Sequence, residues 1–395
     1  MSTVIRVSPF GPGSLITLKP HGNLEVTLST LGASVYSVKV RHPSKGWIEV
    51  NSHYNRYEEA LEDCGTYIGM TVGRFAGRVS NGTFTLDGKK YYTDKNMGAH
   101  TIHGGKAAFD KKQWSYRVLH QPGELVGVEF SYVSPHMENG FPAEVQCLVR
   151  YTILDRQPDA LKMEYEANVT DASPAPATIM NLFNHCYWNI NGIPAENETK
   201  KGDKERWAHA PQVTNLLLRL PNSSTVADTD GSAIPSGEIV PVSGTPLDFQ
   251  TTKRVGKDIL QQEALKRSPP GFDHPYFIDG YTPLTSKAEK ANPKQYKKEI
   301  LHAEVQSPIS GINFKVYSTF PTMWVYSANN MKENASGERG ERFRRYSSLC
   351  LEPQYPPDAA NHAAFKPQSV VVRRGEPYYE SITNVFTVAD APSRL

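Results

Sequence analysis

Three titratable side chains lie in segments that are otherwise apolar or rich in glycine. His103 precedes two glycines, which leave its imidazole accessible. His185 lies in the strand-like run 181–190, and Glu352 follows an apolar stretch and precedes a proline-rich one. A carboxylate is costly to bury unless it has a partner. A carboxylate and an imidazole on opposite sides of a bound molecule supply a general base and a general acid, each typically contributing about 10²–10⁴-fold to a rate.

Each candidate residue, taken alone, also has a purely structural interpretation. An isolated histidine in a strand, such as His185, is more often a satisfied core residue, and Glu352 also fits a structural ion pair. Arg78 fits a structural cation. Asp273 fits a turn, because Asp favours turns. Only the occurrence of all these residues together, in a particular order along the chain, can distinguish a functional role from a structural one.

The composition limits the class of protein. The chain has 395 residues and a formal net charge of +2, so it lacks the basic excess of a nucleic-acid binder. Aromatic residues make up 10% of the sequence, enough for a large core. No apolar run of about 18 residues predicts a membrane span. The four cysteines are far apart and form no CxxC pair, which favours free thiols and a reducing compartment.

Alternating apolar and polar residues predict an all-β chain, a large antiparallel sandwich or barrel with a few short helices. Strands are expected at 24–29, 127–133, 144–153, 160–169, 311–318 and 378–388, and a hairpin at 82–92 turning at Asp87-Gly88. Short helices are expected at 55–63 and 256–264. We expect one domain over residues 1–395. Stretches near 286–298 and 332–345 are expected to be inserted, solvated surface loops.

Cofactor motifs are missing from the sequence. It has no P-loop, no G-x-S-x-G elbow and no complete dinucleotide fingerprint. His100 and His103 form an H-x-x-H pair, but nothing in the sequence completes a metal site around them. We therefore expect neither a metal nor an organic cofactor.

Several motifs together resemble the aldose 1-epimerase (galactose mutarotase) family. They run in family order and cover nearly the whole chain, so their combination is far more specific than any single match. They are the segments 73–78 and 82–88, Ile102-His103-Gly104-Gly105, 109–111, 184–189, 234–240, 244–249, Phe272-Asp273-His274, the Leu-Glu-x-Gln of 351–354, and 357–361.

The resemblance implies roles for individual residues. Glu352 is at the position of the general base acting on the anomeric O1 hydroxyl, and His185 is at that of the general acid at the ring oxygen. His103, Arg78 and Asp273 match positions that hold and polarise the sugar. The implied fold is a large antiparallel β-sandwich with its site in a cleft, and the implied partner is a small sugar such as galactose or glucose, with no cofactor.

Two residues depart from the family pattern. Gly77 precedes Arg78 where the family usually has Asn, and Trp324 stands where many members have Gln. An indole can stack on the apolar face of a pyranose, but it cannot replace the paired donor and acceptor of an amide. Both departures bear on substrate preference, and we count Trp324 among the expected substrate-binding residues.

Two other functions remain open from the sequence. One is a hexose-6-phosphate 1-epimerase, which would need a cationic clamp such as Arg342, Arg344 or Arg345 near the cleft. The other is a sugar-binding module without catalysis, although such a module would not need a matched acid and base.

Localisation and assembly are also open at this point. The final tripeptide, Ser393-Arg394-Leu395, resembles the S-K-L peroxisomal address. The expectation is therefore either the cytoplasm or a peroxisome-like organelle such as a glycosome. We expect a monomer or a weak homodimer, with no nucleic acid and no membrane as partner.

Overall fold

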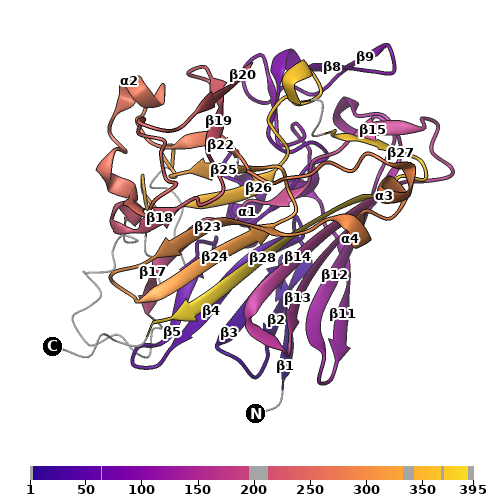
Figure 1. Cartoon of the computed structure of the whole chain (residues 1–395). Coiled ribbons are helices and arrows are strands. Elements are labelled where there is room, and N and C mark those ends of the chain that lie inside the picture. Colours follow the sequence, from indigo (N-terminus) through magenta and orange to yellow (C-terminus); the bar gives the residue numbers. More distant parts are fainter. Residues whose placement is uncertain (1–2, 64, 195–211, 332–341, 366–368, 390–395) are drawn as a thin grey trace.

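The computed structural model describes residues 3–63, 65–194, 212–331, 342–365 and 369–389. The C-terminal tripeptide and Cys64 lie outside these ranges, as does most of the segment expected as a loop near 332–345. The strands form two large antiparallel sheets that face each other, with a smaller third sheet beside them (Figure 1). In the part of the chain covered by these ranges, no helix is long and apolar enough to cross a bilayer.

The first large sheet has six strands, five of them consecutive in the sequence. Its order is β1 (Val4–Phe10), β2 (Gly13–Lys19), β3 (Leu24–Ser29), β4 (Ser34–His42), β5 (Gly46–Asn51) and β17 (Trp188–Pro194). In β3 the apolar residues at 24, 26 and 28 are fully buried, while the polar residues at 25 and 27 are only half-buried. The expected strand at 24–29 is therefore confirmed, with one face in the core.

The second large sheet has nine strands and carries the long antiparallel meander. Its order is β11 (Ser115–Gln121), β12 (Leu125–Ser134), β13 (Val145–Leu154), β14 (Gln157–Val169), β28 (Tyr378–Val388), β24 (Ile312–Ser318), β23 (Ile300–Gln306), β18 (Leu217–Arg219) and β21 (Lys253–Arg254). These bounds confirm the remaining expected strands to within a few residues. The C-terminal strand β28 pairs with β14 and β24, so it joins the middle and late parts of the chain.

The core lies between the two large sheets. Val145, Cys147, Val149 and Tyr151 alternate along β13 and are all fully buried. The Tyr151 hydroxyl donates to the backbone oxygen of Ala33 at 2.6 Å, so the one polar atom of this row is satisfied across the core. Cys147 and two further described cysteines, Cys186 and Cys350, are buried free thiols.

The third sheet has five strands and carries part of the cleft described below. Its order is β20 (Pro235–Pro241), β19 (Thr225–Thr229), β22 (Asp273–Phe277), β25 (Thr322–Tyr326) and β26 (Cys350–Gln354). Four two-stranded pairs complete the fold: β7 (Arg78–Val79) with β10 (Thr101–Ile102), β6 (Thr71–Val72) with β16 (Phe183–Asn184), β8 (Thr83–Leu86) with β9 (Lys89–Tyr92), and β15 (Ala177–Ile179) with β27 (Val371–Arg373). The β8–β9 pair is the expected hairpin, turning at Asp87-Gly88.

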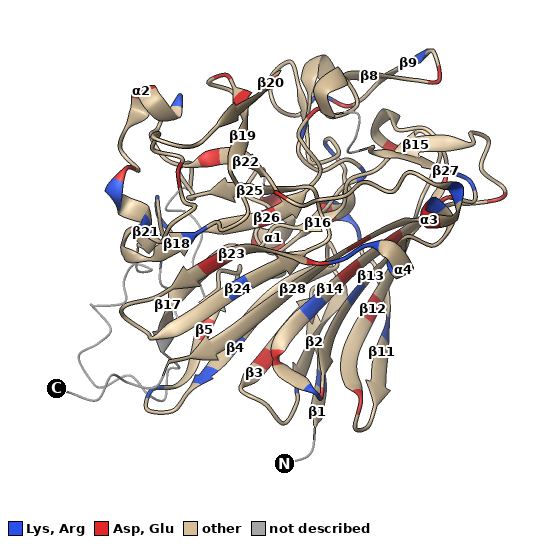
Figure 2. Cartoon of the chain, viewed as in Figure 1, with Lys and Arg blue, Asp and Glu red and all other residues tan. Residues whose placement is uncertain are grey.

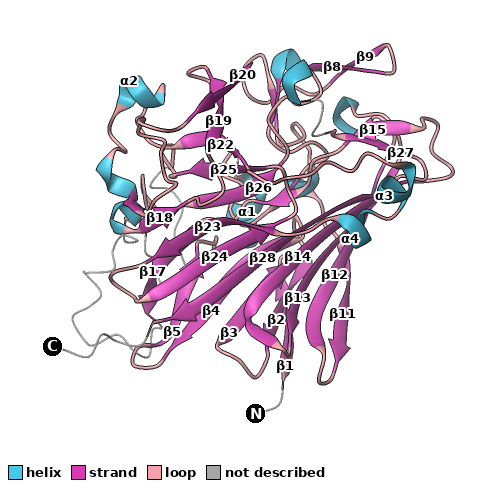
Figure 3. Cartoon of the chain, in the orientation of Figure 1, coloured by secondary structure: helices cyan, strands magenta, loops and turns pink. Residues whose placement is uncertain are grey.

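The helices are short and peripheral (Figure 3). They are α1 (Tyr57–Glu62), α2 (Gln262–Leu265), α3 (Lys287–Ala291) and α4 (Pro293–Tyr296). Single 3₁₀ turns occur at Ser80–Gly82, Phe109–Lys111, Glu138–Gly140, Val213–Asn215, Val255–Lys257 and Ala363–Phe365. The expected helix at 55–63 corresponds to α1. The one expected at 256–264 divides into a 3₁₀ turn and the later, shorter α2.

The segment near 286–298 is exposed over most of its length, as expected, but it is helical rather than a loop. Ser286 forms a capping box with Glu289 that begins α3, and Pro293 occupies the first turn of α4. Just beyond α4, the amine of Lys297 pairs with the carboxylate of Glu380 in β28, and both side chains are buried. The segment is therefore helical and fixed to the nine-stranded sheet. Charges of both signs are scattered over the rest of the fold (Figure 2).

Candidate active site

One cleft of about 540 Å³ contains all six residues singled out from the sequence. Asp273, Trp324 and Glu352 come from β22, β25 and β26 of the five-stranded sheet. Register places Trp324 opposite Glu352, and Asp273 opposite the neighbouring cleft residue Tyr326. Because alternate residues of a strand share a face, these side chains point to the same side of the sheet. Residues from three distant parts of the chain therefore form one wall of the cleft.

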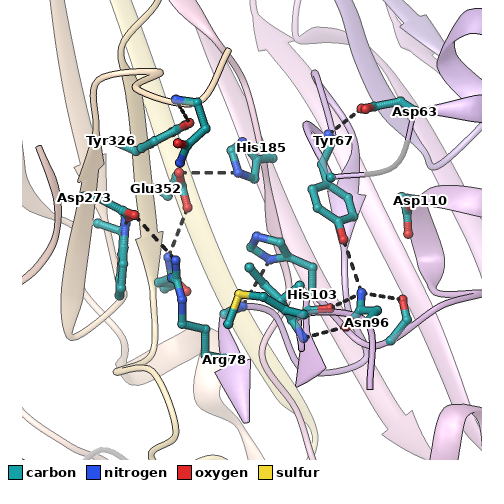
Figure 4. Close-up of a pocket in the computed structure, with 18 of the residues that line it drawn as sticks. Asp63, Tyr67, Arg78, Asn96, His103, Asp110, His185, Asp273, Tyr326 and Glu352 are labelled. Carbon is teal, nitrogen blue, oxygen red and sulfur yellow. Dashed lines mark hydrogen bonds and ion pairs between the residues drawn. The ribbon is translucent and has the colours of Figure 1, made fainter. Parts of the chain in front are cut away.

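Glu352 and His185 lie in contact at the centre of the cleft (Figure 4). The Nε2 atom of His185 is 3.6 Å from Oε1 of Glu352, and both side chains are almost fully buried. His185 follows β16, where its backbone N–H donates to Met70 and its carbonyl accepts from Gly69. Its ring stacks on that of Tyr187 at 5.0 Å between centroids. These contacts hold the imidazole beside the carboxylate.

Burial shifts the two pKa values in opposite directions. It raises the pKa of Glu352 well above the ordinary carboxyl value, and the Asp273 charge adds to this while Arg78 and the amide of Gln354 oppose it. Burial lowers the pKa of His185 to about 3, with a further lowering by Arg78. Each neutral form is thus favoured in the cleft, so the proton of the pair rests on Glu352.

His103 is held by a reciprocal backbone arrangement with Gly77. The Gly77 N–H donates to Nδ1 of His103 at 3.2 Å, and the His103 N–H donates to the Gly77 carbonyl at 2.9 Å. Nδ1 is therefore an acceptor, so the neutral ring carries its proton on Nε2. Burial, together with His185 and Arg78, lowers the pKa of His103 well below its usual value. His103 is therefore a fixed neutral donor in the cleft.

Trp324 and Arg78 both contact Asp273. The indole N–H of Trp324 donates to Oδ1 of Asp273 at 2.6 Å, and the Arg78 guanidinium lies 3.5 Å from Oδ2. Arg78 also lies over the indole ring, 4.8 Å from its centroid. The Trp324 ring, which was expected to stack on a pyranose, is thus already in contact with the Arg78 guanidinium. Trp324 lies in the cleft wall with 3% of its surface exposed, and it fixes the carboxylate of Asp273.

The cleft includes polar residues that the sequence did not single out. The side-chain amide of Asn96 donates to the backbone oxygens of Ile102 and Gly105, and so fastens the turn that bears His103. Tyr67 packs on His103 with its ring centroid 4.7 Å away, a contact between residues too far apart in the sequence for any local pattern to indicate. The side-chain amide of Gln354 donates to Glu352. In the sequence, the only indication of this residue was its place in the Leu-Glu-x-Gln motif.

Acidic and basic side chains also line the side of the cleft away from Asp273. Asp110 is almost fully buried, and burial raises its pKa to about 6. The amine of Lys111 lies 3.6 Å from it and donates to the backbone oxygen of Asp63, another lining residue. Figure 4 shows Asp63 and Asp110 beyond Tyr67, on the side opposite to Glu352. A bound molecule would therefore meet polar groups on both sides.

Among the described residues, one group has ligand atoms close enough for a metal ion. These atoms belong to His185, Cys350 and Glu352 and lie within 4.8 Å of one another. Burial raises the pKa of the Cys350 thiol well above its usual value, which disfavours the thiolate that binds metals. The sulfur is also absent from the cleft lining. The same side chains suit proton transfer between His185 and Glu352 better.

The cleft and the β-sandwich define a class of protein in which a buried carboxyl and imidazole lie in contact inside a polar pocket. Comparison with known proteins gives the family. The aldose 1-epimerase family model matches residues 14–383, nearly the whole chain. The chain therefore belongs to the aldose 1-epimerase family and is an isomerase of that kind.

Relatives and solved structures agree with this assignment. Galactose mutarotase of Sus scrofa is 30% identical over 382 residues, covering 96% of each chain. The aldose 1-epimerase of Escherichia coli K12 is 26% identical over 380 residues, again with 96% of each chain covered. The crystal structure of a galactose 1-epimerase from Lactobacillus acidophilus superposes with a TM-score of 0.76 at 21% identity, covering 98% of this chain and 99% of that one, so its fold is the same.

Proposed function

We propose that this epimerase interconverts the α and β anomers of free galactose and glucose, with Glu352 as the general base and His185 as the general acid. The observation that carries the proposal is the contact between the two side chains, 3.6 Å apart and buried in one polar cleft. A carboxylate and an imidazole so placed can remove one proton from the sugar and return another. The names of the relatives support galactose as a substrate.

The proposed reaction has two proton transfers in each direction. Glu352 accepts the proton of the O1 hydroxyl while His185 donates a proton to the ring oxygen O5, and the C1–O5 bond breaks as the C1–O1 carbonyl forms. Rotation about C1–C2 then presents the other face of the aldehyde. Ring closure returns the proton from Glu352 to O1 and the proton from O5 to His185. The pair ends as it began.

This cycle requires the acid/base pair to hold exactly one proton when the sugar binds. Once the proton of the pair has passed from Glu352 to His185, 3.6 Å away, the ionised carboxyl and the protonated imidazole are ready for ring opening. Transfer of both protons yields the neutral carboxyl and neutral imidazole of the open-chain complex. The total charge is the same in both arrangements, so no ion enters or leaves the buried cleft during a turnover.

The remaining expected site residues suit the task of holding the sugar. We propose that His103 donates from Nε2, and that Arg78 and Asp273 bind hydroxyl groups. Trp324 acts on the sugar chiefly through Asp273, because its N–H is directed at that carboxylate. The buried Nε atom of Arg78 has no hydrogen-bond partner within the described chain, so a sugar oxygen would satisfy it.

Two observations disfavour the alternatives left open by the sequence. Arg342, Arg344 and Arg345 are described, and none of them lines the cleft, so the clamp expected for a phosphorylated sugar is not formed by them. A binding module without catalysis would have no need for a carboxyl and an imidazole buried in contact.

Polarimetry of freshly dissolved α-D-galactose and α-D-glucose tests the proposal. The purified protein should speed the approach to the same final rotation, and the ratio of the two rates gives the preference. Glucose 6-phosphate serves as the discriminating substrate. Acceleration with the phosphorylated sugar alone would replace the proposed substrate, and no acceleration with any of the three would overturn the catalytic proposal.

A further inference from the structure

Gln354 lines the cleft beside Glu352 but has no role in the proton transfers proposed above. It is two residues beyond Glu352 on β26, so both side chains are on the same face of the strand. Its side-chain amide donates from Nε2 to Oε2 of Glu352 at 3.2 Å. His185 contacts the other oxygen, Oε1. The carboxyl is therefore held between an imidazole and an amide.

The oxygen at the other end of the same amide has no hydrogen-bond partner in the described part of the chain. Oε1 of Gln354 is buried, lacks a hydrogen-bond donor among the described residues and belongs to a side chain that lines the cleft. Buried polar atoms of folded proteins are nearly always satisfied. Turning the amide over would place an oxygen against the carboxylate of ionised Glu352, so the observed orientation is the one that suits the base form. An incoming donor is the remaining way to satisfy Oε1.

Gly77 keeps the space beside this oxygen open. A Cβ atom at position 77 would lie 2.9 Å from Oε1 of Gln354, closer than such contacts normally are. Position 77 is one of the two departures from the family pattern, which usually has Asn there. The glycine therefore leaves Oε1 open to a ligand on the side where a longer residue would crowd it.

We propose that Gln354 is a positioning and specificity-determining residue, which orients Glu352 through its amide N–H and accepts a hydrogen bond from the C2 hydroxyl of the sugar through Oε1. The inference rests on the proposed function, in which Glu352 meets O1 and His185 meets O5. Carbon C1 has two ring neighbours, O5 and C2. Since His185 flanks one side of the carboxyl and takes O5, the opposite side, where Gln354 lies, receives C2 and its hydroxyl.

The test combines a substrate change with a side-chain change. D-galactose and 2-deoxy-D-galactose are compared in the wild-type protein, in Gln354→Met, which removes both polar atoms at similar size, and in Gln354→Glu, which keeps an acceptor. Wild type should prefer galactose in kcat/KM by roughly 3–10-fold, the usual effect of one hydrogen bond. Gln354→Met should lose most of this preference, and Gln354→Glu should retain it.

The pH profile provides a readout that a merely structural role would not move. The amide N–H stabilises the ionised form of Glu352, so its loss in Gln354→Met should lower kcat and shift the alkaline limb of activity to higher pH. Thermal melting checks that each variant is folded, and if Gln354→Met does not fold, the retained preference and altered profile of Gln354→Glu decide. An unchanged preference between the two sugars in Gln354→Met would overturn the inference, whereas no turnover of galactose by wild type would instead overturn the proposed function.

Discussion

Replacing Glu352 by Gln should nearly abolish turnover while making the folded protein more stable at neutral pH. The amide is close to the carboxyl in shape but cannot accept the O1 proton, so kcat should fall by about 10²–10⁴-fold, the usual contribution of a positioned base. Loss of function and gain of stability have the same origin. Both follow from burial of a carboxyl that must ionise to act.

The stability effect follows from the pKa shift of Glu352. The folded pKa is raised above the unfolded value near 4.5, so below that value both states are protonated and the shift has no effect. As the pH rises above 4.5, the unfolded chain ionises first and wild type loses about 1.4 kcal/mol of stability per pH unit, until the folded pKa is reached. Gln at this position removes that loss.

The assay is urea denaturation of both proteins at pH 4, 5.5 and 7, with polarimetry on D-galactose beside it. The two proteins should be similar at pH 4, and the variant should gain relative to wild type as the pH rises. Glu129→Gln is the matched control, because the pKa of Glu129 is lowered by Arg117 and Arg150 and its side chain is outside the cleft. That control should keep its activity and lose stability toward neutral pH. A Glu352→Gln protein that kept wild-type turnover, or was the less stable at pH 7, would refute the reasoning.

Three other predictions concern the acid/base pair, the cleft wall and the buried ion pair. The pair of Glu352 and His185 needs one proton, so kcat/KM should stay constant as the pH rises through 6.5 and fall only where Glu352 loses its proton. A fall near pH 6.5 would mean that His185 titrates with an ordinary histidine pKa and would contradict this prediction. Trp324→Phe removes the N–H donor to Asp273 while keeping an aromatic ring, so it should raise KM more than it lowers kcat in steady-state kinetics, and an unchanged KM would remove that hydrogen bond from the binding argument. Lys297→Met leaves Glu380 buried without its cation and should lower the free energy of unfolding by about 3–5 kcal/mol in a urea titration; a loss below about 1 kcal/mol would mean that solvent reaches the carboxylate.

Much of the sandwich was predictable because a strand with one buried face repeats every two residues. The residues at 24, 26 and 28 are buried in β3, and the Asp87-Gly88 turn joins β8 to β9 as expected. The segment near 286–298 is largely exposed, as its lysines and alanines predicted, but it is helical rather than a loop. Its attachment to the sheet depends on the pairing of Lys297 with Glu380, about 80 residues later, and no local pattern contains that contact.

The same distinction applies to the cleft. The candidate residues could be named from motifs, but their geometry could not, since Arg78 and Asp273 are nearly 200 residues apart in the chain. From the sequence, the Trp324 indole was expected to stack on a pyranose, whereas in the structure Arg78 lies over the ring and the indole N–H donates to Asp273. Tyr67 and Asn96 were not predicted. They reach the cleft by contacting the segment around His103, and these contacts depend on the folded arrangement of turns.

The electrostatics of the cleft favour one stage of the proposed reaction. Burial raises the pKa of Glu352 and lowers that of His185, so the proton of the pair rests on the carboxyl. That is the arrangement required while the sugar is open, after O1 has given up its proton and O5 has gained one. The ring-closed complexes require the charged arrangement, which the buried site disfavours. Ring opening from either anomer must therefore begin with transfer of the proton from Glu352 to His185, and the 3.6 Å between Oε1 of Glu352 and Nε2 of His185 allows that transfer within the pair.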